Sequence, residues 1–308
     1  MSILDQLIVQ SLPWMPRPLV AAVGKRYVAG ETVEQMVQAV QQLNQEGCMA
    51  TIDVLGEFVA TPQEAREAAE MYRHVLRLIR HEGLNANVSI KLSQMGLLLD
   101  PMLCLELMRE IVQAAEQLDN FVRIDMEDSA SKGKILDIFQ ALRVVSPNVG
   151  IVIQACLRKS VADIDRLIAQ GVRNIRLCKG IYREPRQLAY QQPDLVNQNY
   201  LYLLERLFEN QVYVGIATHD ERLVWGAMRL IERYRLTPGQ YEFQMLLGVD
   251  PLLRALILDA GCRVRVYVPF GGHWMAYSLR RLHENPTIAR HVVRSLFAEG
   301  LGFKEGLR

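Results

Sequence analysis

Residues 263–284, RVRVYVPFGGHWMAYSLRRLHE, are predicted to form a strand, a glycine turn and a helix in succession. From 263 to 268, charged or aromatic residues alternate with valines, the period of two that places side chains on opposite faces of a strand. Pro269 and the pair Gly271-Gly272 then break the strand, and a helical stretch follows. Strands followed directly by helices are the units from which parallel α/β folds are built.

The helical part of this stretch carries Tyr277, Arg280 and Arg281. Tyr277 lies three and four residues before the two arginines, so the three side chains can share one helix face. Guanidinium groups bind a carboxylate in a bidentate way, and an aromatic ring one turn away can enclose the apolar part of a small ligand. A solvated basic helix surface is the alternative, which two adjacent arginines alone would favour. The strand and glycine turn directly before them favour a binding site.

The same pattern repeats from Cys48 onward. Short apolar strands are predicted at 48–54, 87–92, 121–126, 149–155, 173–178, 212–217, 241–246 and 262–268. The gaps hold amphipathic helices, several of which begin at a capping residue followed by proline, as at Thr61-Pro62, Asp100-Pro101 and Asp250-Pro251. Eight such units predict an α/β fold of the (βα)8 TIM-barrel type. An open doubly wound sheet is the alternative, but it would usually show a glycine-rich phosphate loop after its first strand, and VLGEFVA is not one.

Composition is typical of one large globular domain. The 308 residues are half hydrophobic, and their formal net charge of +1 gives no reason to expect nucleic-acid binding. The five cysteines are scattered without a C-x-x-C pair, so no disulfide framework or zinc site is expected, and a reducing cytosol is the predicted location. Residues 1–46 have no signal-peptide order and are predicted to be an N-terminal helical arm, with 47–308 as the catalytic barrel. No apolar run approaches the roughly 20 residues that span a membrane.

The polar residues inside the predicted strands are unusual for a barrel. Each strand has one apolar and one polar parity, and the polar sets include Thr51 and Asp53; Ser89 and Lys91; Arg123, Asp125 and Glu127; Gln154; Asn174 and Arg176; Glu242 and Gln244; and Arg263, Arg265 and Tyr267. One parity must face the surrounding helices, and the other faces an interior that branched aliphatic residues usually fill. Buried ions are tolerated only when they are paired, so an internal network of acids against bases is expected. The polar groups gather toward the C-terminal strand ends, where barrel enzymes bind ligands.

Several chemistries are compatible with these strand ends. Lys91 and Lys179 suit a Schiff-base lyase or aldolase, although a lysine there is as often an anion anchor. His219 could ligate a metal, but one histidine at one strand end favours a hydrogen-bonding role, and no metal site is predicted. Arg176, Lys179 and Gly180 together suit a phosphate or an electron-rich ring that the backbone approaches closely.

Eight motifs taken together resemble the proline dehydrogenase family, which are flavin-dependent barrel enzymes. The motifs are DVLGE at 53–57, SIKLS at 89–93, IDME at 124–127, VIQA at 152–155, RLCKGIY at 176–182, ATHD at 217–220, FQMLLG at 243–248, and YVPFG with YSLRRLHE through 284. They occur in order, one for each strand, over residues 48–285. The resemblance is to the short monofunctional form and implies a barrel whose last helix lies over the mouth.

The resemblance implies a role for each matched residue. Lys91, Arg280 and Arg281 would hold the proline carboxylate, and Glu57 would pair with Arg280 to close the pocket. The residues that would enclose the proline ring are Tyr267, Tyr277 and Leu246.

Flavin contacts are implied in the same way. Asp125 and Arg176 would be catalytic groups beside the reactive part of the FAD. The residues that would bind FAD are Met126, Gln154, Arg176, Lys179, Gly180, Ile181, Thr218, His219 and Glu284. Ile181 departs from the family pattern, because it is bulkier than the alanine often found there.

The implied reaction is hydride transfer from L-proline to the flavin, which gives Δ1-pyrroline-5-carboxylate as the first step of proline catabolism. A membrane quinone would then accept the electrons, so the resemblance implies a cytoplasmic protein with peripheral contact at the inner face of the membrane. A separate pyrroline-5-carboxylate dehydrogenase would act downstream. Two alternatives from other classes remain, namely a Schiff-base barrel lyase and a non-catalytic ligand-binding barrel.

Overall fold

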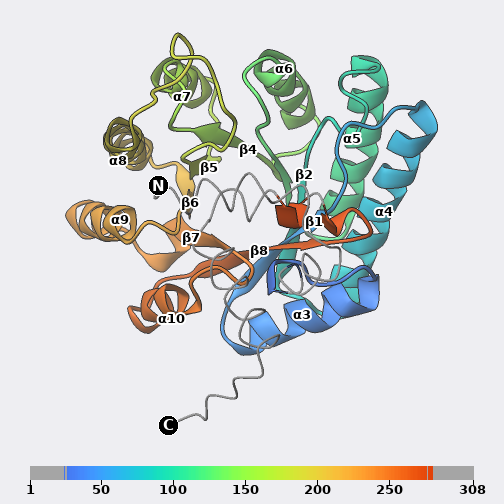
Figure 1. The fold of residues 1–308 in the computed structure, drawn as a ribbon, viewed down its shortest axis with the longest axis horizontal. Helices are drawn as coiled ribbons and strands as arrows, with labels where there is room; N and C mark the ends of the chain where they lie inside the picture. The colour runs from blue at the N-terminus through green and yellow to red at the C-terminus, as the bar shows by residue number, and fades with distance from the viewer. Residues whose placement is uncertain (1–23, 25, 276, 280–308) are drawn as a thin grey trace, which may run out of the picture.

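A closed barrel of eight parallel strands forms the centre of the protein in the computed structural model, which describes residue 24, residues 26–275 and residues 277–279 (Figure 1). The strands are β1 (Met49–Val54), β2 (Ala86–Ile90), β3 (Val122–Ile124), β4 (Val149–Gln154), β5 (Asn174–Cys178), β6 (Tyr213–Ala217), β7 (Tyr241–Leu246) and β8 (Val264–Phe270). Each strand pairs in parallel with the next, and β8 pairs with β1, so the sheet has no edge. The predicted TIM-type barrel is therefore confirmed, and the open sheet is excluded.

The last strand is longer than predicted. Proline was expected to end it, but β8 continues through Pro269 and Phe270, which pair with Asp53 and Val54 of β1. In a sheet, proline lacks only the backbone N–H that would donate a hydrogen bond to the neighbouring strand. Its carbonyl still accepts a hydrogen bond, from Ala29 N–H at 2.9 Å. The glycine at 271, rather than the proline, marks the end of the strand.

In the described part of the chain, eight α-helices surround the barrel (Figure 1). They are α3 (Val33–Gln45), α4 (Pro62–His81), α5 (Pro101–Gln117), α6 (Lys132–Arg143), α7 (Ser160–Ala169), α8 (Pro193–Glu209), α9 (Glu221–Arg233) and α10 (Pro251–Asp259), with a short 3-10 helix η2 (Pro238–Gln240). The predicted caps of three helices are confirmed: the side chains of Thr61, Asp100 and Asp250 each accept a hydrogen bond from a backbone N–H of the first turn. None of the helices in the described part of the chain is long and apolar enough to cross a membrane.

Helix α3 completes the ring of helices although it precedes the first strand. It lies between α10 and α4 against β1 and β8 (Figure 1). Its apolar face, with Met36, Val40 and Leu43, is buried in the same core as the strands. The division of the chain at residue 46 stays a prediction, but residues 33–45 cover the flank of the barrel where its first and last strands meet.

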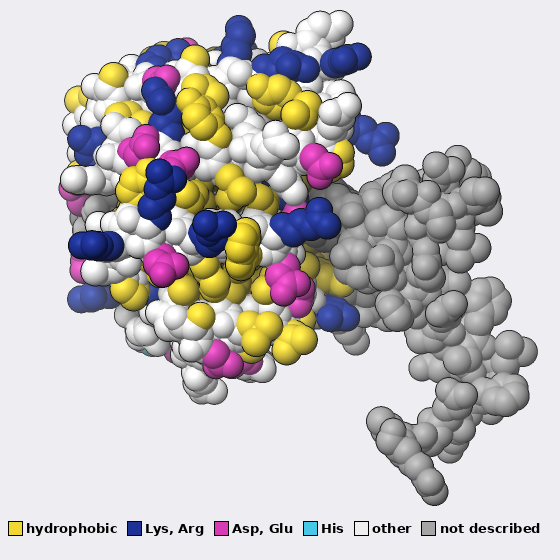
Figure 2. Space-filling model, turned by 90° about the vertical axis from the view of Figure 1, so that its left-hand side faces the viewer, with side chains coloured by type: hydrophobic (Ala, Val, Ile, Leu, Met, Phe, Trp, Pro, Cys, Tyr) yellow, Lys and Arg dark blue, Asp and Glu magenta, His cyan; other side chains and the backbone are white. Residues whose placement is uncertain are grey.

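The outer surface carries charges of both signs. On the side of α8, α9 and α10, Lys and Arg side chains are interspersed with Asp and Glu and with apolar side chains (Figure 2). Trp225 of α9 is 60% exposed, and the Arg229 guanidinium lies 5.0 Å from the centre of its ring. Leu252 and Leu256 of α10 are also more than half exposed.

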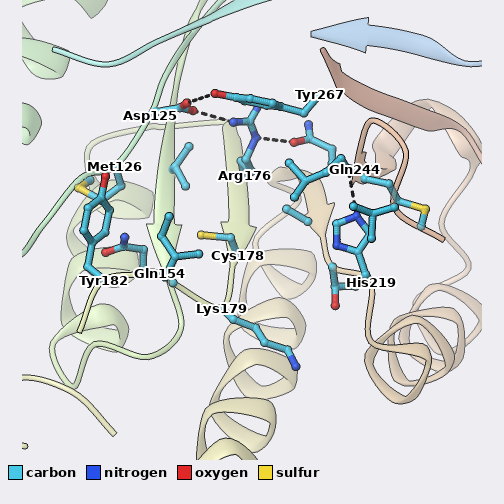
Figure 3. A pocket seen from close by; sticks show the side chains of 18 of the residues that line it. Asp125, Met126, Gln154, Arg176, Cys178, Lys179, Tyr182, His219, Gln244 and Tyr267 are labelled. Carbon is cyan, nitrogen blue, oxygen red and sulfur yellow. Dashed lines mark hydrogen bonds and ion pairs between the residues drawn. The ribbon is translucent and has the colours of Figure 1, made fainter. Parts of the chain in front are cut away.

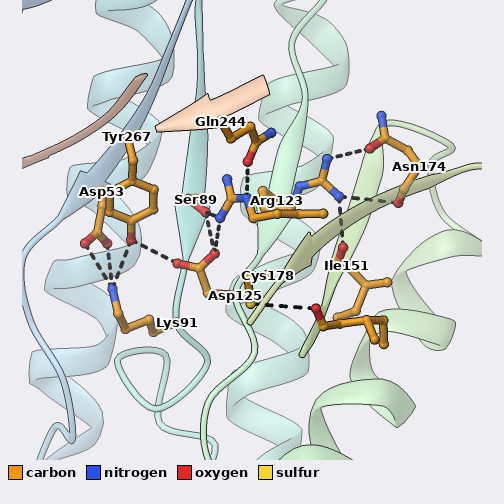
Figure 4. A network of polar contacts seen from close by, with 12 residues as sticks. Asp53, Ser89, Lys91, Arg123, Asp125, Ile151, Asn174, Cys178, Gln244 and Tyr267 are labelled. Atoms are coloured by element: carbon orange, nitrogen blue, oxygen red, sulfur yellow. Dashed lines mark hydrogen bonds and ion pairs between the residues drawn. The ribbon is translucent and has the colours of Figure 1, made fainter. Parts of the chain in front are cut away.

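The predicted internal network of acids and bases is confirmed (Figure 4). Three ion pairs join side chains inside the barrel, namely Lys91–Asp53 at 3.0 Å, Arg176–Asp125 at 2.7 Å and Arg265–Glu242 at 2.7 Å. Arg123 donates to the carbonyl of Ile151 and to the side chain of Asn174. The opposite parity, with residues such as Ile52, Val88 and Ile124, is fully buried against the helices. The barrel therefore has an apolar outer layer and a polar, ion-paired interior.

Glu242 is expected to contribute to the stability of this interior in acid. It accepts hydrogen bonds from Arg265, Tyr213 and Gln244 at 2.5–2.8 Å. Burial alone would raise the pKa of Glu242, but the Arg265 charge and these hydrogen bonds lower it to about 2, below the ordinary value of 4.5. The ionised carboxylate therefore adds stability above pH 4.5, which is lost as the pH falls toward 2.

We expect Glu242→Gln to remove this dependence. The wild-type protein should lose roughly 3 kcal/mol more than the variant over that acid range. Urea unfolding of both proteins at several pH values measures the difference. Parallel curves for the two proteins would show that Glu242 does not titrate with folding.

Candidate functional site

A cavity of about 440 Å³ opens at the C-terminal ends of the strands (Figure 3). Its wall includes residues at or just beyond the ends of β3 to β7, such as Asp125, Gln154, Lys179, Thr218 and Leu246. This is the face where barrel enzymes bind their ligands, and the volume lies in the range of small-molecule sites.

An ion pair between Asp125 and Arg176 lies at the inner end of the cavity (Figure 3). One Asp125 oxygen accepts from Arg176 at 2.7 Å and from the Ser89 hydroxyl at 2.6 Å, and the other accepts from the Tyr267 hydroxyl at 2.9 Å. Arg176 also donates to Ser89 and to the Gln244 side-chain oxygen. Both ends of the pair are buried, so their geometry is fixed before any ligand arrives.

Lys91 forms a second buried ion pair beside the first. Its ammonium lies 3.0 and 3.1 Å from the two oxygens of Asp53 and 3.3 Å from the Tyr267 hydroxyl (Figure 4). Burial lowers the pKa of Lys91, but the charges of Asp53 and Asp125 outweigh burial and raise it above the usual value. Burial, and then the neighbouring carboxylates, raise the pKa of Tyr267 well above its usual value. Lys91 is therefore a protonated cation and Tyr267 a neutral phenol at neutral pH.

This protonation state bears on the Schiff-base alternative. A lysine must be neutral to attack a carbonyl, and enzymes achieve this by lowering its pKa. The pKa of Lys91 moves in the opposite direction. Lys179 is held by the Asp220 carboxylate at 2.7 Å. Both candidate lysines are thus ion-paired, which favours the anion-anchor interpretation.

The loop that follows β5 brings Lys179 and Gly180 to the wall of the cavity. Gly180 has φ = +100°, and a Cβ there would collide with the Cys156 sulfur, so only glycine suits this position. Asp220 caps α9 by accepting from Arg222 N–H, and its other oxygen accepts from Lys179 and Asn197. The cation therefore has a fixed position at the rim.

His219 has the hydrogen-bonding role that the sequence favoured over metal ligation. Its Nε2 accepts from the Leu246 backbone N–H at 2.8 Å, so the proton of the neutral ring is on Nδ1. The adjacent Thr218 hydroxyl accepts from Asp220 N–H at 3.0 Å. The first contact joins the ends of β6 and β7, and the second lies within the loop that follows β6.

Most of the predicted site residues come together in this cavity. Those that line it are Lys91, Asp125, Met126, Gln154, Arg176, Lys179, Gly180, Ile181, Thr218, His219, Leu246, Tyr267 and Tyr277. Glu57 is half-buried after β1 and, among the described residues, is not part of the lining, although its charge helps to raise the pKa of Lys91. Arg280, Arg281 and Glu284 lie outside the described residues.

The cavity also contains residues for which no role was predicted. Gln244 belongs to the polar parity of its strand and Tyr182 to the RLCKGIY motif, so a sequence signal existed for both. Tyr182 lies beside Met126 and Gln154 (Figure 3). Tyr27 is part of the lining as well, yet it lies outside the repeat, and the sequence shows no pattern that connects it to the strands.

Known proteins resemble this chain over most of its length. The sequence profile of the family described as "Proline dehydrogenase" matches residues 36–294. Proline dehydrogenase 1 of Bacillus subtilis (strain 168) is 35% identical over 272 residues, which cover 88% of this chain and 90% of the relative. Proline dehydrogenase of Deinococcus radiodurans is 36% identical over 278 residues, with coverages of 88% and 89%.

A solved structure has the same fold. The crystal structure of proline utilization A (PutA) from Bdellovibrio bacteriovorus inactivated by N-propargylglycine superposes with a TM-score of 0.80 at 26% identity. The match covers 86% of this chain and 33% of that chain, so this chain spans about a third of the longer protein.

Proposed function

The chain belongs to the proline dehydrogenase family, and from this membership we propose that it oxidises L-proline to Δ1-pyrroline-5-carboxylate with FAD as its cofactor. The observation that supports the proposal most is the convergence of the residues implied by the resemblance. They come from separate strands and loops far apart in the sequence, and most of them line one cavity at the barrel mouth.

The residues of the cavity fit a flavin. The family resemblance implies this cofactor, whose ring is flat and aromatic, with oxygen and nitrogen atoms along one edge. Met126, Val152 and Leu246 offer apolar contact surface, while Gln154 and Arg176 offer polar groups in the same lining. When bound, FAD supplies the acceptor for the hydride that leaves the carbon next to the proline nitrogen.

We assign the substrate carboxylate to a set of cations. Lys91 is one, and Arg280 and Arg281 are proposed as the others from the resemblance. Lys91 is already fixed by Asp53, so it can orient an anion without first losing side-chain freedom. Tyr267, Tyr277 and Leu246 would enclose the ring, and Glu57 would pair with Arg280 to keep water out.

Asp125 and Arg176 are proposed as the catalytic groups. Arg176 places a buried positive charge in the cavity, where it would stabilise negative charge that develops on a reduced ring. Asp125 holds this guanidinium and the Tyr267 hydroxyl in place through its two oxygens. Lys179, Gly180, Ile181, Thr218 and His219 would contact FAD further along the wall. Glu284 is proposed as an FAD contact from the resemblance alone.

We propose a quinone as the electron acceptor and peripheral contact of a cytoplasmic protein with the inner face of the membrane. The exposed Trp225, Leu252 and Leu256 on neighbouring helices support such a contact, because aromatic and apolar side chains beside arginines suit a membrane interface. A separate pyrroline-5-carboxylate dehydrogenase would consume the product.

An absorption spectrum of the purified protein, recorded before and after anaerobic addition of L-proline, tests the proposal. A flavin band that bleaches with L-proline but not with D-proline is expected. A band that persists with both would overturn the substrate while leaving the flavin in place. A colourless protein that borohydride traps covalently with a substrate would instead establish the lyase.

A further inference from the structure

Tyr27 combines two features that seldom occur together. Its side chain is 1% exposed, and its hydroxyl is buried without a hydrogen-bond partner among the described residues. The same side chain lines the cavity at the barrel mouth. Most buried hydroxyls have a hydrogen-bond partner, because a buried hydroxyl without one has lost its hydrogen bonds to water and formed none in their place. A buried, unpaired phenol whose residue lines a cavity is therefore suited to pair with a ligand that enters it.

Tyr27 lies at the end of a helical turn. This turn and the residues after it, through residue 31, are held in place at several points. Arg26 donates a side-chain hydrogen bond to the Gly248 carbonyl at 2.9 Å, next to the end of β7. Ala29 N–H donates to the Pro269 carbonyl at 2.9 Å, and Gly271 N–H donates to the Gly30 carbonyl at 2.9 Å, both at the end of β8.

The segment beyond β8 contacts the same turn. A Cβ on Gly24 would lie 2.8 Å from the Ser278 hydroxyl, so the Gly24 backbone lies close against the Ser278 side chain. The Trp274 indole N–H donates to the Glu31 carboxylate at 2.7 Å. Because both ends of the turn are fixed, the position of Tyr27 is set by the fold rather than by a ligand.

We propose that Tyr27 is a ligand-binding residue whose hydroxyl donates a hydrogen bond to an oxygen of the molecule bound in the cavity. This inference rests on the proposed function. The acceptor is an oxygen either of the substrate carboxylate or of the flavin. Residues 24–31 precede the 36–294 region that the family profile matches, so the segment before the barrel contributes to the site itself.

The protonation state suits a donor. Burial raises the pKa of Tyr27 and outweighs the nearby Arg26 charge, which lowers it, so the phenol keeps its proton at neutral pH. Leu246 at the end of β7 and Tyr267 of β8 line the same cavity.

Tyr27→Phe tests the proposal, because it removes one oxygen and keeps the ring. In the flavin-free full-length chain, the hydroxyl has no partner to lose among the described residues, so the urea midpoint should stay the same or rise. In the holoenzyme, the proline concentration for half-maximal anaerobic flavin bleaching should increase about 10-fold if the carboxylate is the acceptor. If the flavin is the acceptor, the dissociation constant of FAD should increase by a similar factor instead.

Tyr200→Phe is the matched control. Tyr200 is equally buried, but its hydroxyl donates to the Leu177 carbonyl at 3.0 Å, outside the cavity lining. This variant should lose stability and keep its affinities for proline and FAD. Unchanged affinities for both ligands in Tyr27→Phe, or a loss of stability like that of Tyr200→Phe, would overturn the assignment. If wild-type protein binds FAD but is not bleached by proline, the proposed function fails, while the FAD titration still decides the role of Tyr27.

Discussion

Replacing Arg176 with methionine is expected to reduce both the stability of the protein and its turnover of proline by large factors. The guanidinium is 6% exposed and pairs with Asp125 while donating to Ser89 and Gln244. Methionine would leave the Asp125 carboxylate buried without this cation. Breaking a buried ion pair from one side costs about 3–5 kcal/mol, because the remaining charge is not compensated.

The catalytic loss should be separable from the loss of stability. Removing one preorganised charge at a reaction centre costs about 100-fold or more in rate, so kcat/KM should fall at least that far. The double variant Asp125→Asn/Arg176→Met leaves no orphan charge and should regain much of the stability while remaining inactive. Urea unfolding and proline-dependent flavin reduction measure the two effects.

Arg158→Met is a suitable control for that experiment. Arg158 is exposed, stacks on the Tyr190 ring at 4.6 Å and donates to the Arg186 carbonyl. We expect only a small change in stability and none in turnover. If Arg176→Met changed stability and turnover as little as this control, the Arg176–Asp125 ion pair would have no role in stability or in turnover.

Replacing Lys91 with methionine is expected to raise the KM for proline roughly 10- to 100-fold, because a charge-assisted contact with the substrate carboxylate is lost. The variant also leaves Asp53 without its cation. Burial already raises the pKa of Asp53, and Lys91 is the main group that lowers it. Without Lys91, the Asp53 carboxyl should be protonated in the folded protein over a wider pH range.

A pH titration of stability provides a second readout for Lys91→Met. A carboxyl whose folded pKa lies above its unfolded value contributes stability that is complete below the unfolded pKa and is lost as the pH rises through the folded pKa. The stability of the variant should therefore fall with rising pH more steeply than that of the wild type. Adding Asp53→Asn should remove the slope and leave the KM high. A slope that survives this second change would contradict the role given to Asp53.

The sequence predicted the barrel well because its evidence is periodic. The parity of residues such as Arg123, Asp125, Glu242 and Arg265 depends only on spacing, and spacing is enough to place them inside a closed sheet. The ion pairs also followed, since unpaired charges are not tolerated there. The predicted end of β8 was wrong because a proline lacks only its backbone N–H donor. Whether this missing donor ends a strand depends on whether the neighbouring strand needs that hydrogen bond.

Contacts between distant segments could not be predicted in the same way. Asp220 holds Lys179 and Asn197 at once, and nothing in the spacing of these residues connects them. The placement of Tyr27 depends on a turn that contacts Gly248, Pro269 and Ser278, which lie more than 200 positions away in the sequence. Local patterns decide which face a residue occupies, while the identity of its neighbours follows from the closure of the whole barrel.

The place of α3 has a consequence for how this enzyme can diversify. Because a helix from before the first strand covers the flank where β1 and β8 meet, the described residues that follow β8, 271–275 and 277–279, are not needed to cover that flank. That chain supplies Tyr277 to the cavity instead. In this architecture the segment after residue 270 can accumulate substitutions that alter ligand selectivity while the barrel wall remains closed. The cover of this flank and part of the cavity wall are thereby supplied by segments on opposite sides of the barrel sequence.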